Sequence, residues 1–303
     1  MTGINQKTTL SGLKVKAAMR RQVIRLSTYS TIGSCIRTML KYKADAVLIC
    51  DQEGKSLGIV SKTDIMTAYY AELPLSTPID AILVGPVLCC AEDDCLESSL
   101  DTMHQNAINR LYVLDAHNQE QIKGILAYPD IVGLLYRYCK NCVQNIFKRD
   151  DHLFGQSVQQ HLLVNEVMGR CLRAHGFRES LMDVMETLAA YKFGAVLIKD
   201  EWGKPAGVLS KTDLMHAYYK NFPVQSASHK VMNSPVYSCA QEEHLASAIQ
   251  KMIYSDVQRL FVYKADKENI VGVLSLSDAA RARSGSCRAC IASRITDHAE
   301  VLA

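Results

Sequence analysis

A four-residue pattern, Ser-x-x-Asp, carries the side chains in this chain that are best suited to hold a ligand. It occurs as Ser61-Lys-Thr-Asp64, Ser210-Lys-Thr-Asp213 and Ser275-Leu-Ser-Asp278, each time at the expected start of a helix. A carboxylate at a helix start can accept hydrogen bonds from two adjacent hydroxyl groups, such as those of a ribose. The neighbouring hydroxyl side chains and the free backbone N–H groups favour a phosphate anion. These residue types therefore suit a nucleotide.

The same pattern also caps helices. Ser and Asp at these positions satisfy the first backbone N–H groups of a helix whether or not a ligand binds. The two roles are compatible, and a cap alone does not require the Lys-Thr before Asp64 and Asp213. A related segment, Ala127-Tyr-Pro-Asp130, lacks the first hydroxyl and places Pro at the helix start. We expect Asp130 to act as a helix cap, and we expect a ligand cleft beside it to bind weakly or to stay empty.

Basic residues near the pattern are candidates for neutralising phosphate charge. Two are lysines within the pattern and two are arginines that each open a predicted strand. The alternative is that the lysines are solvated and that the arginines pair with local carboxylates. The candidate nucleotide-binding residues are Ser61, Lys62, Thr63, Asp64, Arg110, Ser210, Lys211, Thr212, Asp213, Arg259, Ser275, Ser277 and Asp278.

An internal duplication organises the chain. Residues 61–74 match residues 210–223 at an offset of 149 residues, which also relates Arg110 to Arg259. A weaker repeat within each half relates Gly58-Ile-Val-Ser to Gly124-Ile-Leu-Ala. A unit of about 60 residues is therefore used four times.

Each unit has one predicted order of elements: a short strand, a helix, two strands around a polar turn, and a final helix. Three short strands bury little apolar surface, so we expect the units to pair. The prediction is an α+β fold in which each unit is a three-stranded sheet with helices. The predicted boundaries are a first module at 14–140 (repeats about 14–71 and 78–138), a linker at 141–161, a second module at 162–285 (repeats about 162–220 and 228–285) and a tail at 286–303.

This order, with Gly-h-h-Ser-x-x-Asp at the last junction (h, hydrophobic), resembles the CBS domain named after cystathionine β-synthase, over nearly the whole chain. The resemblance implies four CBS repeats arranged as two pseudo-symmetric CBS-pair modules, with ligand clefts between repeats. It implies AMP, ADP, ATP or S-adenosylmethionine as ligand, with Asp64, Asp213 and Asp278 at the ribose position. The fourth repeat locally resembles the gamma subunit of AMP-activated protein kinase. Asn109 and Gln258 stand where that family usually has His.

Two Cys-x-x-Cys motifs form a second candidate site. Cys139 and Cys142 follow Asp130 at the same spacing at which Cys287 and Cys290 follow Asp278. If the two modules bring these ends together, four thiolates could hold zinc or an iron–sulfur cluster. A redox dithiol pair and cysteines left by the duplication are the alternatives.

Composition argues against several functional classes. The net charge of +3 and the pI near 8.2 are too weakly basic for a nucleic-acid-binding protein. The apolar run at 81–91 is too short to cross a bilayer, and the N-terminus lacks the apolar core of a signal peptide. Eleven cysteines, an odd number, suit a reducing compartment, so we expect a cytoplasmic location. Cys35, Cys50 and Cys171 lie in apolar runs, and we expect them to be buried.

The motifs of metalloproteases, P-loop proteins and serine hydrolases are missing, so we expect no catalytic activity. The favoured hypothesis is a regulatory protein that binds an adenosine-containing nucleotide, AMP, ADP or ATP, between its repeats. It would transmit the change to a separate protein partner, and a homo-oligomer is compatible with it. The alternatives are an S-adenosylmethionine sensor, and a metal- or redox-responsive scaffold built on the four cysteines with vestigial nucleotide clefts.

Overall fold

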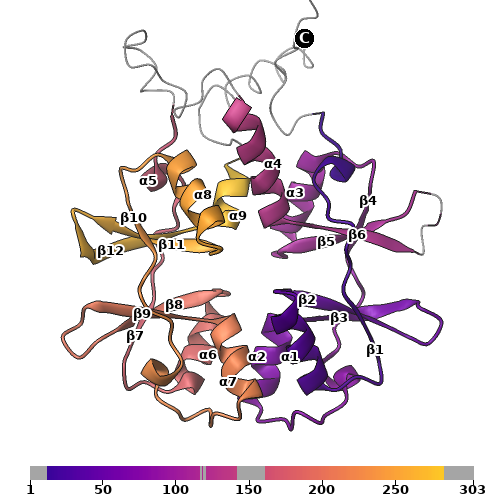
Figure 1. Cartoon of the computed structure of the whole chain (residues 1–303), viewed down its shortest axis with the longest axis horizontal. Coiled ribbons are helices and arrows are strands. Elements are labelled where there is room, and N and C mark those ends of the chain that lie inside the picture. The colour runs from indigo at the N-terminus through magenta and orange to yellow at the C-terminus, as the bar shows by residue number, and fades with distance from the viewer. Residues whose placement is uncertain (1–11, 117, 119–120, 142–160, 283–303) are drawn as a thin grey trace, which may run out of the picture.

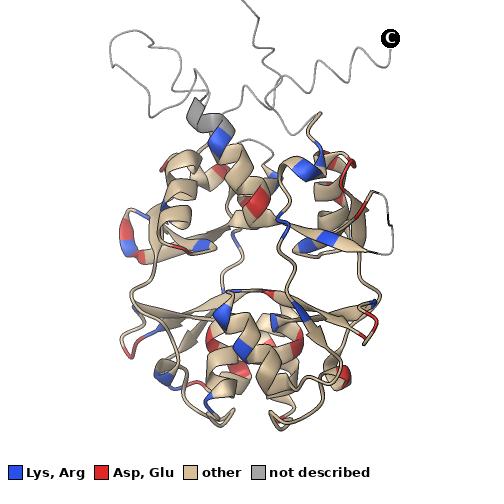
Figure 2. Ribbon diagram, turned by 45° about the vertical axis from the view of Figure 1, so that its right-hand side comes forward, with Lys and Arg blue, Asp and Glu red and all other residues tan. Residues whose placement is uncertain are grey.

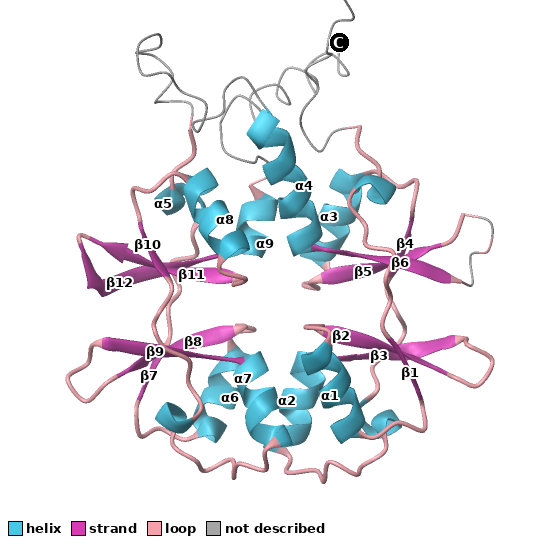
Figure 3. Ribbon diagram, viewed as in Figure 1, coloured by secondary structure: helices cyan, strands magenta, loops and turns pink. Residues whose placement is uncertain are grey.

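The computed structural model of the chain describes residues 12–116, 118, 121–141 and 161–282. Within these ranges it forms four sheets of three strands each, which surround the centre of the molecule, with helices on their outer sides (Figures 1 and 3). In every sheet the first strand is parallel to the second, and the second is antiparallel to the third. The α+β fold of four repeats in two modules is confirmed.

The first module contains two repeats with the same order of elements. Repeat one comprises η1 (Val15–Ala17), β1 (Arg25–Ser27), α1 (Ile32–Lys41), β2 (Ala46–Cys50), β3 (Ser56–Ser61) and α2 (Lys62–Tyr70). Repeat two comprises η2 (Ile79–Ile82), β4 (Cys89–Ala91), α3 (Leu96–Gln105), β5 (Arg110–Leu114), β6 (Ile122–Ala127) and α4 (Tyr128–Asn141).

The second module repeats this order. Repeat three comprises α5 (Val164–Val167), β7 (Ala174–Gly176), α6 (Leu181–Ala190), β8 (Ala195–Lys199), β9 (Pro205–Ser210) and α7 (Lys211–Tyr219). Repeat four comprises η5 (Ser228–Lys230), β10 (Ser238–Ala240), α8 (Leu245–Tyr254), β11 (Arg259–Lys264), β12 (Asp266–Ser275) and α9 (Leu276–Arg281).

The middle strand of a sheet is buried on both faces, which explains its unbroken apolar sequence. In β2, Val47 and Ile49 belong to the core that the sheet forms with the helices. Leu48 and Cys50 alternate with them and belong to a second core, which they share with Tyr112 of β5. The sheets of repeats one and two therefore pack face to face within the module.

The helices of one module pack against those of the other. A continuous core joins the helices of repeats one and three, where α2 lies against α7. A second core joins those of repeats two and four, where α4 lies against α9. Tyr69 and Tyr218 stack between α2 and α7, with ring centroids 4.8 Å apart. The two modules thus share their hydrophobic cores, which places the starts of α2 and α7 near one another.

Candidate functional site

Each complete Ser-x-x-Asp segment begins a helix in the structure. The backbone N–H and the hydroxyl of Ser61 donate to one oxygen, Oδ2, of Asp64 at 2.7 and 2.6 Å. The same two bonds recur in the pairs Ser210–Asp213, at 2.7 and 2.6 Å, and Ser275–Asp278, at 2.9 and 2.5 Å. Capping is thus present in all three segments, and a ligand would have to use the other carboxylate oxygen, Oδ1.

The Oδ1 atoms of these three aspartates have different partners. Oδ1 of Asp213 accepts a hydrogen bond from the side-chain amide of Asn233, and Oδ1 of Asp278 pairs with Arg281 in the next turn of α9. For Oδ1 of Asp64, the described residues supply no hydrogen bond or ion pair. Among the described contacts, Asp64 is therefore the one of the three whose Oδ1 is not already used.

The linker that enters the neighbouring repeat explains this difference. Isolated antiparallel bridges pair Ile59 with Val84 in the first module and Val208 with Asn233 in the second. Positions 84 and 233 correspond under the offset of 149 residues. The linker residue next to the Asp64 segment is thus the apolar Val84. The corresponding residue of the second module is Asn233, whose side-chain amide binds Asp213. Asp213 is only 8% exposed, and burial raises its pKa.

Both carboxylate oxygens of Asp130, in the second repeat, already have partners within the protein. Its Oδ2 accepts from the backbone N–H of Ala127 at 2.9 Å, and its Oδ1 lies 2.8 Å from Nε of Arg20. The linker before β1 brings Arg20 there through a bridge to Ile125. In the duplicate, Gly169 occupies the corresponding position. Burial raises the pKa of Asp130, and the Arg20 guanidinium opposes that shift.

The predicted cations of the first module are neutralised by a residue that is not among those predicted from the sequence, Asp45. The Asp45 carboxylate lies 2.6 Å from Nζ of Lys62 and 3.3 Å from Nη2 of Arg110. Burial disfavours the ionised form of Asp45, but these two cations outweigh it, so the pKa of Asp45 lies below its usual value. The amide of Gln258, from repeat four, approaches Asp45 at 3.5 Å.

The corresponding cations of the second module have no carboxylate partner in the described ranges. Lys211 donates to the Thr63 hydroxyl of repeat one at 2.8 Å. Arg259 packs against Gly194, where a β-carbon would collide with the guanidinium, and forms no hydrogen bond or ion pair with any described residue. Burial lowers the pKa of both groups, and the charge of Arg259 lowers that of Lys211 further.

These contacts bring all four predicted cations together. Figure 2 shows basic residues on the segments that surround the centre of the molecule. The charge of Asp45 acts on Arg259 of the other module, and the charge of Asp64 acts on Lys211. The hydroxyl residues of the remaining segments lie at the helix starts: Thr212 is half-buried, and the hydroxyl oxygen of Ser277 is 2.7 Å from that of Ser275.

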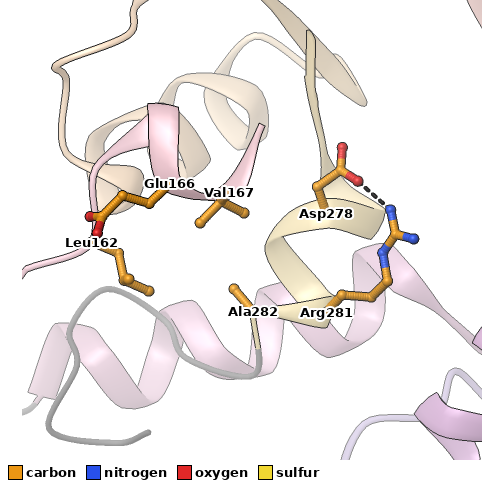
Figure 4. Close-up of a pocket in the computed structure, with 6 residues that line it drawn as sticks. All are labelled: Leu162, Glu166, Val167, Asp278, Arg281 and Ala282. Carbon is orange, nitrogen blue, oxygen red and sulfur yellow. Dashed lines mark hydrogen bonds and ion pairs between the residues drawn. The ribbon is translucent and has the colours of Figure 1, made fainter. Parts of the chain in front are cut away.

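A pocket of about 350 Å³ lies beside Asp278 (Figure 4). It is within the size range of small-molecule sites, at the low end. The Asp278–Arg281 ion pair forms one wall, and α5 supplies the opposite one. Its lining residues are Leu162, Glu166, Val167, Asp278, Arg281 and Ala282.

Arg20, Asp45 and Asn233 are not among the site residues predicted from the sequence. A signal for them was present, because each stands where the two halves of the duplication differ in polarity or charge. Their counterparts are Gly169, Gly194 and Val84. A position-by-position comparison of the halves would have identified them.

The predicted cysteine site falls on residues that the structure does not describe. Cys142, Cys287 and Cys290 lie outside the described ranges, as does the side chain of Cys139 in α4. Among the described residues, no group of three or more His, Cys, Asp or Glu side chains could hold a metal ion. Cys35 and Cys50 are buried as expected. The expectation for Cys171 is wrong: it is exposed, because it lies in the linker before β7 and not within an apolar element.

Of the helices in the described part of the chain, none has both the length and the apolar composition to cross a membrane.

A family model described as the CBS domain matches residues 15–71 and 227–285, which are the first and fourth repeats. The sequence is 27% identical over 119 residues to the inosine-5'-monophosphate dehydrogenase of Methanocaldococcus jannaschii. That match covers 39% of this chain but only 23% of the dehydrogenase.

Two solved structures share the fold over most of the chain. One, from Methanocaldococcus jannaschii, has been proposed as an archaeal homologue of g-AMPK; it has a TM-score of 0.73 and 15% identity, covering 89% of this chain and 99% of that protein. The other, an uncharacterised conserved protein of Pyrococcus horikoshii, has a TM-score of 0.58 and 17% identity, covering 89% of this chain and all of that protein. At these identities they establish the fold alone. The first and fourth repeats match the CBS-domain model, and the second and third have the same topology, so the chain has the fold of four CBS repeats in two pairs.

Proposed function

We propose that this protein is a non-catalytic regulator that binds an adenosine-containing nucleotide, AMP, ADP or ATP, in clefts between its repeats. The observation that supports this most directly is the position of Asp64. Its open oxygen can accept ribose hydroxyls, and the adjacent residue, Thr63, is bonded to Lys211 of the second module. An acceptor for hydroxyl groups thus lies beside cations suited to phosphate, as a nucleotide requires.

The pocket beside Asp278 is the second proposed cleft. Asp278 has the same Ser-x-x-Asp geometry as Asp64, and Arg281, which holds its Oδ1, has a 41% exposed side chain. An exposed partner on the flexible end of a side chain can move away at small cost. Asp130 and Asp213 are weaker candidates, because Arg20 and Asn233 already occupy them.

Charge favours a phosphate-bearing ligand over S-adenosylmethionine. Asp45 is the one described carboxylate that pairs with the four central cations, which are Lys62, Arg110, Lys211 and Arg259. S-adenosylmethionine carries a sulfonium, an ammonium and only one carboxylate, so its net charge is positive and such a centre attracts it less than it attracts a nucleotide phosphate.

Regulation would follow from the shared helix layer. A ligand held at the start of α2 would also meet Lys211 at the start of α7, and these helices pack against each other across the two modules. If the nucleotide binds one packing arrangement more tightly than another, it shifts the population toward that arrangement. A separate protein that contacts the exposed surface of these helices could then detect the shift.

Isothermal titration of the full chain with AMP, ADP, ATP and S-adenosylmethionine tests the proposal. Asp64→Asn should lower AMP affinity by about tenfold or more, because hydrogen bonds to a charged acceptor contribute about 1.5–3 kcal/mol. Asp130→Asn is the matched control, since Arg20 occupies that carboxylate, and it should leave AMP affinity unchanged. Lack of nucleotide binding at millimolar concentrations, or an equal loss in both variants, would rule the proposal out.

A further inference from the structure

The duplication has left the centre of the molecule with two unequal halves. Lys62 and Arg110 of the first module correspond to Lys211 and Arg259 of the second, so both halves carry the same two cations. The residue between them differs, because Asp45 of the first module corresponds to Gly194 of the second.

In the first half, the two cations are already satisfied. The Asp45 carboxylate lies 2.6 Å from Nζ of Lys62 and 3.3 Å from Nη2 of Arg110. The side chains of these two cations are only 17% and 11% exposed. A partly buried carboxylate between two cations is held in its ionised form and is not easily displaced. A phosphate entering this half would have to compete with Asp45.

In the second half, the same two cations lack an anion among the described residues. The guanidinium of Arg259 lies against Gly194, in the space that a side chain at that position would fill. Lys211 reaches only the neutral hydroxyl of Thr63. The nearest carboxylates, Asp45, Asp213 and Asp278, act on Arg259 only through space. Two neighbouring, partly buried positive charges without an anion are costly, and an anion that binds both removes that cost.

We infer that Arg259 and Lys211 form the phosphoryl site of this protein, and that Asp45 closes the equivalent site in the first module by acting as its internal anion. The inference rests on the proposed function and deepens it, because it assigns the phosphate of the bound nucleotide to one half of the centre. The ligand class is a phosphoryl group or another compact anion of similar charge.

Inorganic pyrophosphate, titrated into the full chain and followed by phosphorus NMR, probes this site without the nucleoside. Arg259→Gln and Lys211→Gln should each weaken pyrophosphate binding by about tenfold or more, as expected for the loss of a charge-assisted hydrogen bond. Arg110→Gln and Lys62→Gln should weaken binding clearly less, because Asp45 already pairs with both cations. The control is Arg178→Gln, whose exposed side chain pairs with Glu201 and which should leave the affinity unchanged. Asp45→Gly, which copies the second half, should open an additional site and increase the number of bound anions. Lys211→Gln keeps the test decisive if Arg259→Gln does not fold, as judged by circular dichroism.

The outcomes separate this inference from the proposed function. No binding of pyrophosphate to the unmodified protein, or equal losses in Arg110→Gln and Arg259→Gln, would overturn the inference, even if adenosine still binds. A second outcome is that pyrophosphate binding depends on Arg259, adenosine does not bind, and AMP binds no more tightly than pyrophosphate. That outcome would support the inference and contradict the proposed function.

Discussion

At the scale of residues, the four copies of one motif have become different through single neighbours. Each Asp of the motif accepts with Oδ2 at its helix start, and the partner of Oδ1 distinguishes one copy from another. Asn233 and Arg20 occupy two of these oxygens, while the described residues leave that of Asp64 open. The two arginine–lysine pairs also differ through a single residue. Asp45 neutralises the pair of the first module, and the described part of the second module has no counterpart to it.

The ion pairs of Asp45 predict a specific pH dependence of stability. Because its pKa is lower in the folded protein than in the unfolded chain, Asp45 stabilises the fold fully above its unfolded pKa of about 3.9. This contribution is lost as the pH falls through the folded pKa. Asp45→Asn should lower the free energy of unfolding by about 1–3 kcal/mol at neutral pH, between the values typical of surface and buried pairs.

Chemical denaturation of both proteins from about pH 7 to about pH 3 measures this effect. The difference between them should be constant down to about pH 4.5 and should shrink below about pH 4. A difference that stays constant over the whole range would show that the carboxylate charge does not stabilise the fold.

At the scale of elements, the sequence was sufficient to predict the repeats, the order of strands and helices along the chain, and the helix starts at the Ser-x-x-Asp segments. The duplication and the Ser-x-x-Asp caps are local signals that survive without an alignment. The pairing of helices across modules could not be predicted, because an apolar stripe on α6 does not specify which helix covers it. The contact between Asp45 and Arg110 was missed for a similar reason: it joins two different sheets, and Asp45 precedes a strand, where a solvated side chain is the ordinary expectation.

The shared helix core predicts that damage to one module spreads to the other. Leu188 of α6 is fully buried among side chains from both modules. Leu188→Ala should lower the free energy of unfolding by about 2–5 kcal/mol, as expected for a cavity in a close-packed core. Hydrogen exchange should then become faster in α1 and α2 of the first module as well as in α6 and α7.

Trp202→Ala is the control for this experiment, since Trp202 is 81% exposed in the β8–β9 turn and should affect neither module. If the faster exchange stayed within α6 and α7, the two modules would be independent folding units and the shared core would have no energetic role.

At the scale of the whole molecule, the fold places the Asp64 segment of one module beside cations of the other. The sheets pair within a module, and the helices pair between modules. The contacts of the four cations involve residues of all four repeats. A nucleotide that joined Asp64 to Lys211 would therefore span the two modules. Its binding energy could shift their relative packing, which is what a regulator without catalytic activity needs.

A crystal structure of the full chain grown with AMP shows whether the nucleotide binds at these aspartates. We expect the ribose hydroxyls of AMP on Oδ1 of Asp64, or on Oδ1 of Asp278 once Arg281 has moved away from it. We also expect the Asp45 pairs with Lys62 and Arg110 to remain intact, and a phosphate at the centre to lie on Arg259 and Lys211. A structure without AMP at either aspartate at millimolar concentration, or with the ribose away from both carboxylates, would disprove this mode of binding.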